Sequence, residues 1–132
     1  LHEFLIKAQK NAIKMAIGSA AIPFNIDFVI DKLSIRSHFK AIISANDVKL
    51  SKPDPETFSN CAKALGVKPQ ECIVFEDVPK GVESAQRAGM KCFVITTTHN
   101  VDEFHNFENI LGFIDDYNSP ILTQLFQKQI QS

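Results

Sequence analysis

The chain has 132 residues, 45% of them hydrophobic, which suits one folded domain and is too apolar for a disordered chain. Its 14 basic and 15 acidic residues argue against a nucleic-acid-binding surface, and no apolar run is long enough for a membrane span, so we expect no nucleic-acid and no membrane partner. Three widely spaced cysteines without a C-x-x-C pair, and no visible signal peptide, favour a cytoplasmic location.

Helical and extended patterns alternate along the whole chain. Helix-period apolar residues, with prolines near the starts and glycines at two ends, predict helices at 2–10, 23–33, 55–65, 79–88 and 120–131. Short apolar runs between them predict strands at 14–18, 41–45, 72–75, 91–96 and 113–115. Strands that are apolar on both faces and separated by helices indicate a doubly wound parallel sheet. We therefore expect an α/β, three-layer Rossmann-like fold in a single domain, 1–132.

Four polar residues follow strands of this expected sheet. They are Ser19, Lys52, Glu76 and Asp77. In open parallel sheets, ligands bind at the carboxyl ends of the strands. We expect Ser19, Glu76 and Asp77 on one rim, with Lys52 leaning back over it from the loop 46–53.

Each of these residues has a chemical interpretation and a plainer alternative. Adjacent carboxylates at a buried strand end repel each other unless a cation compensates, and oxygen ligands favour Mg²⁺ or Ca²⁺; alternatively, Asp77 only caps the next helix. Lys52, in a loop stiffened by prolines, would supply positive charge to a phosphate, or it is a solvated turn lysine. Ser19 and the N–H groups after it would bind phosphate oxygens, or its hydroxyl makes a local turn bond. No histidine base accompanies Ser19, so it is not expected to be a nucleophile.

Three segments together resemble a known family. Gly18–Ser19–Ala20, Ser51–Lys52–Pro53–Asp54–Pro55 and Val74–Phe75–Glu76–Asp77–Val78–Pro79–Lys80–Gly81 resemble motifs two, three and four of the haloacid dehalogenase-like superfamily, in the same order and on the same strands. The continuation to Met90 resembles the β-phosphoglucomutase-like branch. The resemblance covers about residues 1–100.

The resemblance implies Mg²⁺-dependent phosphoryl transfer through an aspartyl-phosphate, by a phosphatase or phosphomutase acting on small phosphorylated metabolites such as sugar phosphates. Carried over to this chain, Ser19 and the backbone of Ala20 would bind the phosphoryl group, and Lys52 would neutralise it. Asp77 and Glu76 would hold Mg²⁺.

One part of the family pattern has no counterpart. The nucleophilic and acid/base aspartates of motif one precede all the segments found here. Asp27 with Asp31 lies on a helix, and Asp115 with Asp116 comes too late in the chain. We expect a partial core domain without its first, central strand, nucleophile and helical cap, inactive alone although the intact protein is an enzyme. A missing N-terminal segment of the same protein would fill an apolar slot between two unpaired strand edges.

Two other functions stay open at this stage. One is a non-catalytic module that binds phosphate and metal without a nucleophile. The other is an unrelated doubly wound α/β domain in which the Glu76–Asp77 pair is incidental.

Overall fold

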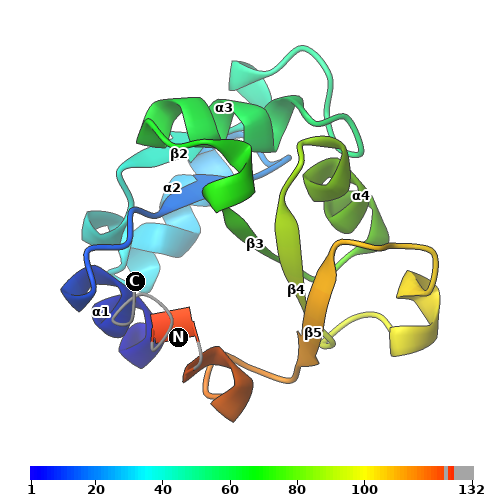
Figure 1. Cartoon of the computed structure of the whole chain (residues 1–132). Helices are drawn as coiled ribbons and strands as arrows, with labels where there is room; N and C mark the ends of the chain where they lie inside the picture. Colours follow the sequence, from blue (N-terminus) through cyan, green and yellow to red (C-terminus); the bar gives the residue numbers. More distant parts are fainter. Residues whose placement is uncertain (124, 127–132) are drawn as a thin grey trace.

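A computed structural model describes residues 1–123, 125 and 126. Its helices and strands alternate as the sequence predicts (Figure 1). The helices are α1 (His2–Lys10), α2 (Pro23–Lys32), α3 (Glu56–Leu65) and α4 (Pro79–Arg87). The strands are β1 (Ala16–Gly18), β2 (Ala41–Ile43), β3 (Ile73–Glu76), β4 (Lys91–Ile95) and β5 (Ile110–Ile114). No helix in this part of the chain is long and apolar enough to cross a membrane.

The strands form two separate parallel sheets. β1 pairs with β2, with Ile17 opposite Ile42, and β3, β4 and β5 pair in that order, with Val74 opposite Cys92. In the described residues β1 and β3 do not pair with each other. The α/β class and the parallel strands are therefore confirmed, while the sheet is divided between β1 and β3.

Side chains alternate across the C-terminal sheet and so create two cores. Val74, Cys92 and Val94 point toward the helices α3 and α4, where they pack with Val82 and Ala85. The opposite face carries Phe93, Ile114 and their neighbours, which pack against Leu122 and Phe4. Because successive residues of a strand face opposite sides, both faces of this sheet are apolar and packed against other elements, while Leu111 and Phe113 of the edge strand β5 stay exposed.

The N-terminal sheet also lies between helices. On one face, Leu5 of α1 and Ile26 and Ile30 of α2 form a core with Ile35. On the other face, α3 packs so closely that a Cβ at Gly18 would lie 3.0 Å from both Thr57 Cγ2 and Cys61 Sγ. A glycine is thus needed at the end of β1 to bring α3 onto the strand.

Element boundaries differ from the predicted ones in a few places. The last strand starts at Ile110, because the Asn109 amide donates to Met90 O at 3.0 Å and holds the chain beside the start of β4. Of the helix predicted at 120–131, the structure shows a 3₁₀ turn at Pro120–Leu122, and residues 124 and 127–132 lie outside the described part.

The three cysteines are free thiols that differ in burial. Cys61 and Cys92 are buried, whereas Cys72 is half-buried.

Candidate functional site

Lys52 connects the ends of the two sheets. Its Nζ lies 2.8 Å from Glu76 Oε2, at the end of β3, and donates a hydrogen bond of 3.1 Å to Gly18 O, at the end of β1. The ammonium also lies 4.5 Å from the centroid of the Phe58 ring. The side chains of Lys52 and Glu76 are only 13% and 10% exposed, so Lys52 is not a solvated turn lysine. This position is the one that the sequence predicted, over the rim formed by the strand ends.

The loop that carries Lys52 is fixed at several points beyond its prolines. Asp54 Oδ1 accepts from Glu56 N at 2.9 Å, which satisfies a free N–H at the start of α3. The Glu56 carboxylate accepts from the backbone N–H groups of Lys49 and Leu50. From α4, Ser84 Oγ donates to Asp54 O at 2.7 Å. Lys52 therefore extends from a loop whose backbone is bonded to two helices.

Glu76 has two partners and a tightly shaped space. Besides the Lys52 ion pair, its Oε1 accepts from Asp77 N at 3.1 Å. Its side chain lies over the first turn of α4 at Gly81, where any Cβ would overlap the carboxylate. Glycine is a poor helix former, so its presence here is explained by the room that Glu76 requires. The Glu76 carboxylate is thus occupied in holding Lys52.

Asp77 does not cap the following helix. The N-cap of α4 is Val78, which makes no side-chain capping bond. The Asp77 carbonyl accepts from Thr98 Oγ1 at 3.3 Å, and its carboxylate has no hydrogen bond or ion pair within the described residues. The plainer alternative for Asp77 is therefore not supported by the geometry.

Ser19 is held so that it can still donate. Its Oγ accepts from Ala21 N at 3.0 Å, which leaves the hydroxyl hydrogen free to turn to another acceptor. The Ser19 N–H is used in the sheet, donating to Ile43 O at 2.9 Å. The Ala20 N–H makes no hydrogen bond in the part of the chain that the structure describes. One hydroxyl and one backbone donor are thus available beyond the end of β1.

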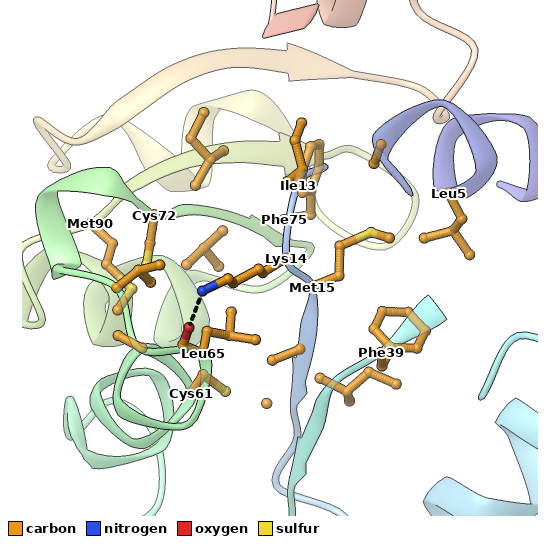
Figure 2. Close-up of a pocket in the computed structure, with 18 of the residues that line it drawn as sticks. Leu5, Ile13, Lys14, Met15, Phe39, Cys61, Leu65, Cys72, Phe75 and Met90 are labelled. Atoms are coloured by element: carbon orange, nitrogen blue, oxygen red, sulfur yellow. Dashed lines mark hydrogen bonds between the residues drawn. The ribbon is translucent and has the colours of Figure 1, made fainter. Parts of the chain in front are cut away.

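A cavity of about 650 Å³ separates β1 from β3. Figure 2 shows Cys61, Cys72 and Met90 on one side of it and Leu5, Met15 and Phe39 on the other. Lys14, just before β1, reaches across and donates to Leu65 O, the last residue of α3, at 3.1 Å. The predicted apolar slot between the two strands is therefore present in the structure.

Comparison with known proteins identifies the family. The family model for haloacid dehalogenase-like hydrolases matches residues 1–95. The chain belongs to the haloacid dehalogenase-like hydrolase family. It is 36% identical over 86 residues to a fructose-1-phosphate phosphatase of Escherichia coli, covering 65% of this chain and 46% of that protein. It is 30% identical over 118 residues to a validoxylamine A 7′-phosphate phosphatase of Streptomyces hygroscopicus subsp. limoneus, covering 89% of this chain and 55% of that protein.

A solved structure shows the same fold. The crystal structure of β-phosphoglucomutase from Clostridium difficile superposes with a TM-score of 0.80 and 28% identity, covering 99% of this chain and 56% of that one. The chain thus spans about half the length of the relatives that it matches. Membership in the haloacid dehalogenase-like family excludes the unrelated doubly wound domain considered from the sequence.

The acidic pairs rejected as nucleophiles have structural partners in this haloacid dehalogenase-like protein. Arg36 binds Asp27 and Asp31, at 2.8 Å in each case, and so fastens α2 to the turn that follows it. Asp116 Oδ1 accepts from Asn118 N at 2.8 Å within a turn, and Asp115 accepts from Thr96 Oγ1. None of these four aspartates contacts Lys52 through a hydrogen bond or ion pair within the described residues.

An aromatic group next to the site was not predicted from the sequence. Tyr117, three residues after β5, packs against Phe75 of β3 and Phe4 of α1, with ring centroids 5.5 and 5.4 Å apart. Burial, together with the negative charges of Asp77 and Glu76, raises the pKa of Tyr117 to about 12. The phenol thus stays neutral beside the acidic pair. The one feature of the sequence that could have indicated it is a single tyrosine in the otherwise polar segment 115–119.

The donor set of the rim suits a hard cation. Asp77 offers a carboxylate, and one or two carboxylates with water and substrate oxygens are the usual protein ligands of Mg²⁺. Glu76 is already paired with Lys52. The described residues contain no cluster of three or more His, Cys, Asp or Glu side chains that could hold a metal by themselves. Asp77 therefore fits Mg²⁺ as a single protein ligand, not as part of a closed metal cage.

Proposed function

We propose that this haloacid dehalogenase-like protein carries out Mg²⁺-dependent phosphoryl transfer on small phosphorylated metabolites, as a phosphatase or a phosphomutase. The reaction would pass through an aspartyl-phosphate whose nucleophile is supplied from outside these 132 residues. The relatives support the substrate class, because their names specify a fructose-1-phosphate phosphatase, a validoxylamine A 7′-phosphate phosphatase and a β-phosphoglucomutase.

The contact that carries this proposal is the bridge made by Lys52 between Gly18 O and Glu76 Oε2. It brings residues that are 34 and 24 positions apart in sequence to one point at the carboxyl ends of β1 and β3. A mostly buried ammonium at the meeting point of two parallel sheets is a suitable partner for a phosphate.

Each residue of the rim has a defined task in this proposal. Ser19 would donate its free hydroxyl hydrogen to a phosphate oxygen, and the Ala20 N–H would donate to a second one. Lys52 would offset the negative charge of the phosphate and of the attacking carboxylate, while Glu76 holds the ammonium in place. Substitution of Glu76 would then act through the position of Lys52.

The charge balance of the rim favours a divalent cation. Glu76 and Asp77 together outnumber Lys52 by one negative charge, so an incoming phosphate dianion is repelled unless further positive charge is present. When bound through Asp77, Mg²⁺ would supply that charge and polarise the phosphate oxygens. Asp77 is the carboxylate available for this task, because Glu76 is committed to Lys52.

The test is phosphate release by the full natural gene product, with a panel of sugar phosphates and Mg²⁺. We expect Asp77→Asn and Lys52→Met each to lower kcat/KM by at least about 100-fold, since each would remove charge stabilisation at the transferring group. Asp102→Asn, which changes an exposed carboxylate in the 3₁₀ helix Val101–Phe104, is the matched control and should leave kcat/KM unaffected. Full activity of the Asp77→Asn variant would refute the metal role.

The same experiment examines the non-catalytic alternative. We expect the 132-residue chain alone to release no phosphate while it binds inorganic phosphate in the presence of Mg²⁺, measured by titration calorimetry. If the full gene product likewise binds but does not turn over any substrate of the panel, the protein is a phosphate-binding module and not an enzyme.

A further inference from the structure

Helix α2 carries apolar side chains on two opposite sides. Ile26 and Ile30 are buried in the N-terminal core. Phe28 lies two residues from each of them, a rotation of about 200° around the helix, and so points away from that core. Phe24, one turn earlier, shares this side with Phe28. The two phenylalanines are 75% and 63% exposed, so the described residues cover only one of the two apolar sides.

Two further exposed apolar residues widen this side of the helix. Val29 and Leu33, four residues apart, form the row next to Phe28. We call these residues the outer face of α2: Phe24, Phe28, Val29 and Leu33. Other exposed apolar side chains, such as Val101 and Leu111, lie on separate elements. Single exposed apolar residues are ordinary, whereas a contiguous apolar patch marks an interaction site.

The size of the outer face suits a small interface. A whole aromatic side chain offers about 150–250 Å², so the exposed parts of the four residues amount to roughly 500 Å². Two such faces in contact would bury about 1,000–1,200 Å² once the stems of neighbouring side chains are included, which is near the lower end of specific interfaces. The patch is therefore sufficient for a reversible dimer and not for a permanent one.

The charges that border the outer face cancel one another. On one flank, Arg36 binds Asp27 and Asp31, at 2.8 Å in each case. One turn beyond Phe28, Lys32 places its Nζ 5.7 Å from the centroid of the Phe28 ring. Two positive and two negative side chains leave no net charge, so two copies of this face do not repel each other. A nucleic acid or a strongly charged peptide, in contrast, would gain no net attraction here.

The order of residues along α2 makes the outer face complementary to itself. A two-fold interface brings the same surface of both copies together. With the two helices antiparallel and crossing at Phe28, Phe24 of each copy lies opposite Lys32 of the other. This places an ammonium against an aromatic ring, which is attractive. A parallel arrangement would instead bring the two Lys32 ammonium groups together, and like charges at an interface are unfavourable.

We propose that the outer face of α2 is the interface of a symmetric homodimer. The α2 helices of two copies pack antiparallel, with the two Phe28 rings at the two-fold axis. The phenylalanines are the anchors of this contact, because large aromatic side chains dominate interface energetics. This inference goes beyond the proposed phosphoryl transfer and does not depend on it.

Sedimentation velocity of the full natural gene product, and of the 132-residue chain beside it, measures the association. Over about 1–200 µM we expect a monomer–dimer equilibrium with a micromolar dissociation constant. Phe28→Lys should raise this constant at least about 100-fold, since the dimer loses two anchors and gains two facing charges. Val101→Lys, at a residue 49% exposed on another element, is the matched control and should leave it unchanged. An unaltered urea midpoint confirms that each variant is folded.

A second variant tests the charge pattern. Lys32→Glu should raise the dissociation constant about tenfold, because it removes the cation opposite Phe24 and gives both faces a net negative charge. Added salt should restore part of the affinity by screening that repulsion. Lys63→Glu makes the same charge change at an exposed position on α3 and should have no effect.

Cross-linking tests the antiparallel orientation. Under oxidised glutathione, Phe28→Cys should form a disulfide-linked dimer, because its two copies meet at the axis. Lys32→Cys alone should not, whereas a mixture of Lys32→Cys and Phe24→Cys chains should form the mixed dimer. The natural sequence, with its three thiols, is the blank for all of these reactions.

Three results would overturn the inference. The first is a full gene product that stays monomeric over the whole concentration range; if the 132-residue chain then dimerises through Phe28, the rest of the gene product covers the outer face. The second is a dimer that Phe28→Lys leaves intact, which would place the interface elsewhere. The third is cross-linking of Lys32→Cys to itself but not to Phe24→Cys, which would show a parallel arrangement.

Discussion

The two sheets of this protein differ in how firmly they are built. In the C-terminal sheet, β4 is central, and Cys92 and Val94 are completely buried between the strand's neighbours and α4. In the N-terminal sheet, both strands have three residues, and every one of them is only half-buried. The difference shows that the C-terminal sheet has a fully buried central strand and the N-terminal sheet has none, although strands of both sheets, β1 and β3, border the cavity.

The residues of the candidate site lie at the boundary between these unequal halves. Ser19 and Gly18 belong to the N-terminal sheet, Glu76 and Asp77 to the C-terminal one, and Lys52 joins the two. Local stability is not uniform across a structure, and regions with fewer buried contacts open more readily. We therefore expect amide hydrogen exchange to be faster in β1 and β2 than in β4.

The largest expected difference in unfolding free energy between the two halves comes from removing one aromatic ring in each. Phe104 is 1% exposed in the C-terminal core, so Phe104→Ala should lower the free energy of unfolding by about 3–5 kcal/mol. Phe39, half-buried against the N-terminal core, should cost about half as much when changed to alanine. Urea denaturation followed by far-UV circular dichroism measures both values. Equal costs would contradict the view that the halves differ in packing.

The next effect concerns the ion pair between Lys52 and Glu76, which joins the two sheets. Lys52→Met leaves the mostly buried Glu76 carboxylate without its ion-pair partner and should cost about 2–3 kcal/mol of unfolding free energy. The double variant Lys52→Met/Glu76→Gln should recover a large part of that loss, because no uncompensated charge remains. A double-mutant cycle in urea measures the coupling. Additive losses would mean that the pair contributes nothing to joining the sheets.

A smaller effect is expected at the first turn of α4. Gly81→Ala places a Cβ where the Glu76 side chain lies and should cost about 1–2 kcal/mol. In the Glu76→Ala background the same change should be neutral or stabilise by up to about 1 kcal/mol, since alanine favours helix over glycine. Thermal and urea unfolding measure the effect of Gly81→Ala on the free energy of unfolding in both backgrounds. We expect a loss in the natural sequence and no loss, or a gain, in the Glu76→Ala variant. A loss of the same size in both backgrounds would show that Glu76 does not set the need for glycine.

The smallest effect is a dependence on alkaline pH. Burial raises the pKa of the Cys92 thiol to about 12 from its ordinary value near 9, so the folded protein keeps this proton when the unfolded chain has lost it. Stability from this group is complete below pH 9 and falls as pH rises toward 12, at up to about 1.4 kcal/mol per pH unit. Urea unfolding between pH 8 and pH 9.5, where this group accounts for less than about 1 kcal/mol, measures the slope, which should be shallower in Cys92→Ala. An unchanged slope in that variant would assign the loss to other groups, such as Tyr117.

Much of this architecture could be predicted from the sequence because its signals are local. Proline at the start of α2 and α4 and glycine after α3 marked helix ends, and short β-branched runs marked strands. The position of Lys52 followed from the rule that carboxyl ends of parallel strands share one edge. These inferences need only the order of elements along the chain.

Other features could not be predicted because they depend on contacts between distant residues. Glu76 rather than Asp77 forms the ion pair with Lys52, and Asp77 is left as the available carboxylate. This pairing depends on the direction of the Glu76 side chain, for which Gly81 leaves room. The packing of Tyr117 against Phe75 requires the return of the chain after β5. The early start of β5 reflects the hydrogen bonds of Asn109, which no propensity reports.

The room that Gly81 leaves for Glu76 also constrains how this sequence can change over time. Positions 52, 76 and 81 are physically coupled: a larger residue at 81 fits without strain only when the side chain at 76 is shorter, and a shorter side chain at 76 leaves the ammonium at 52 without its partner. Among descendants of this chain, substitutions at the three positions should therefore arrive together or not at all.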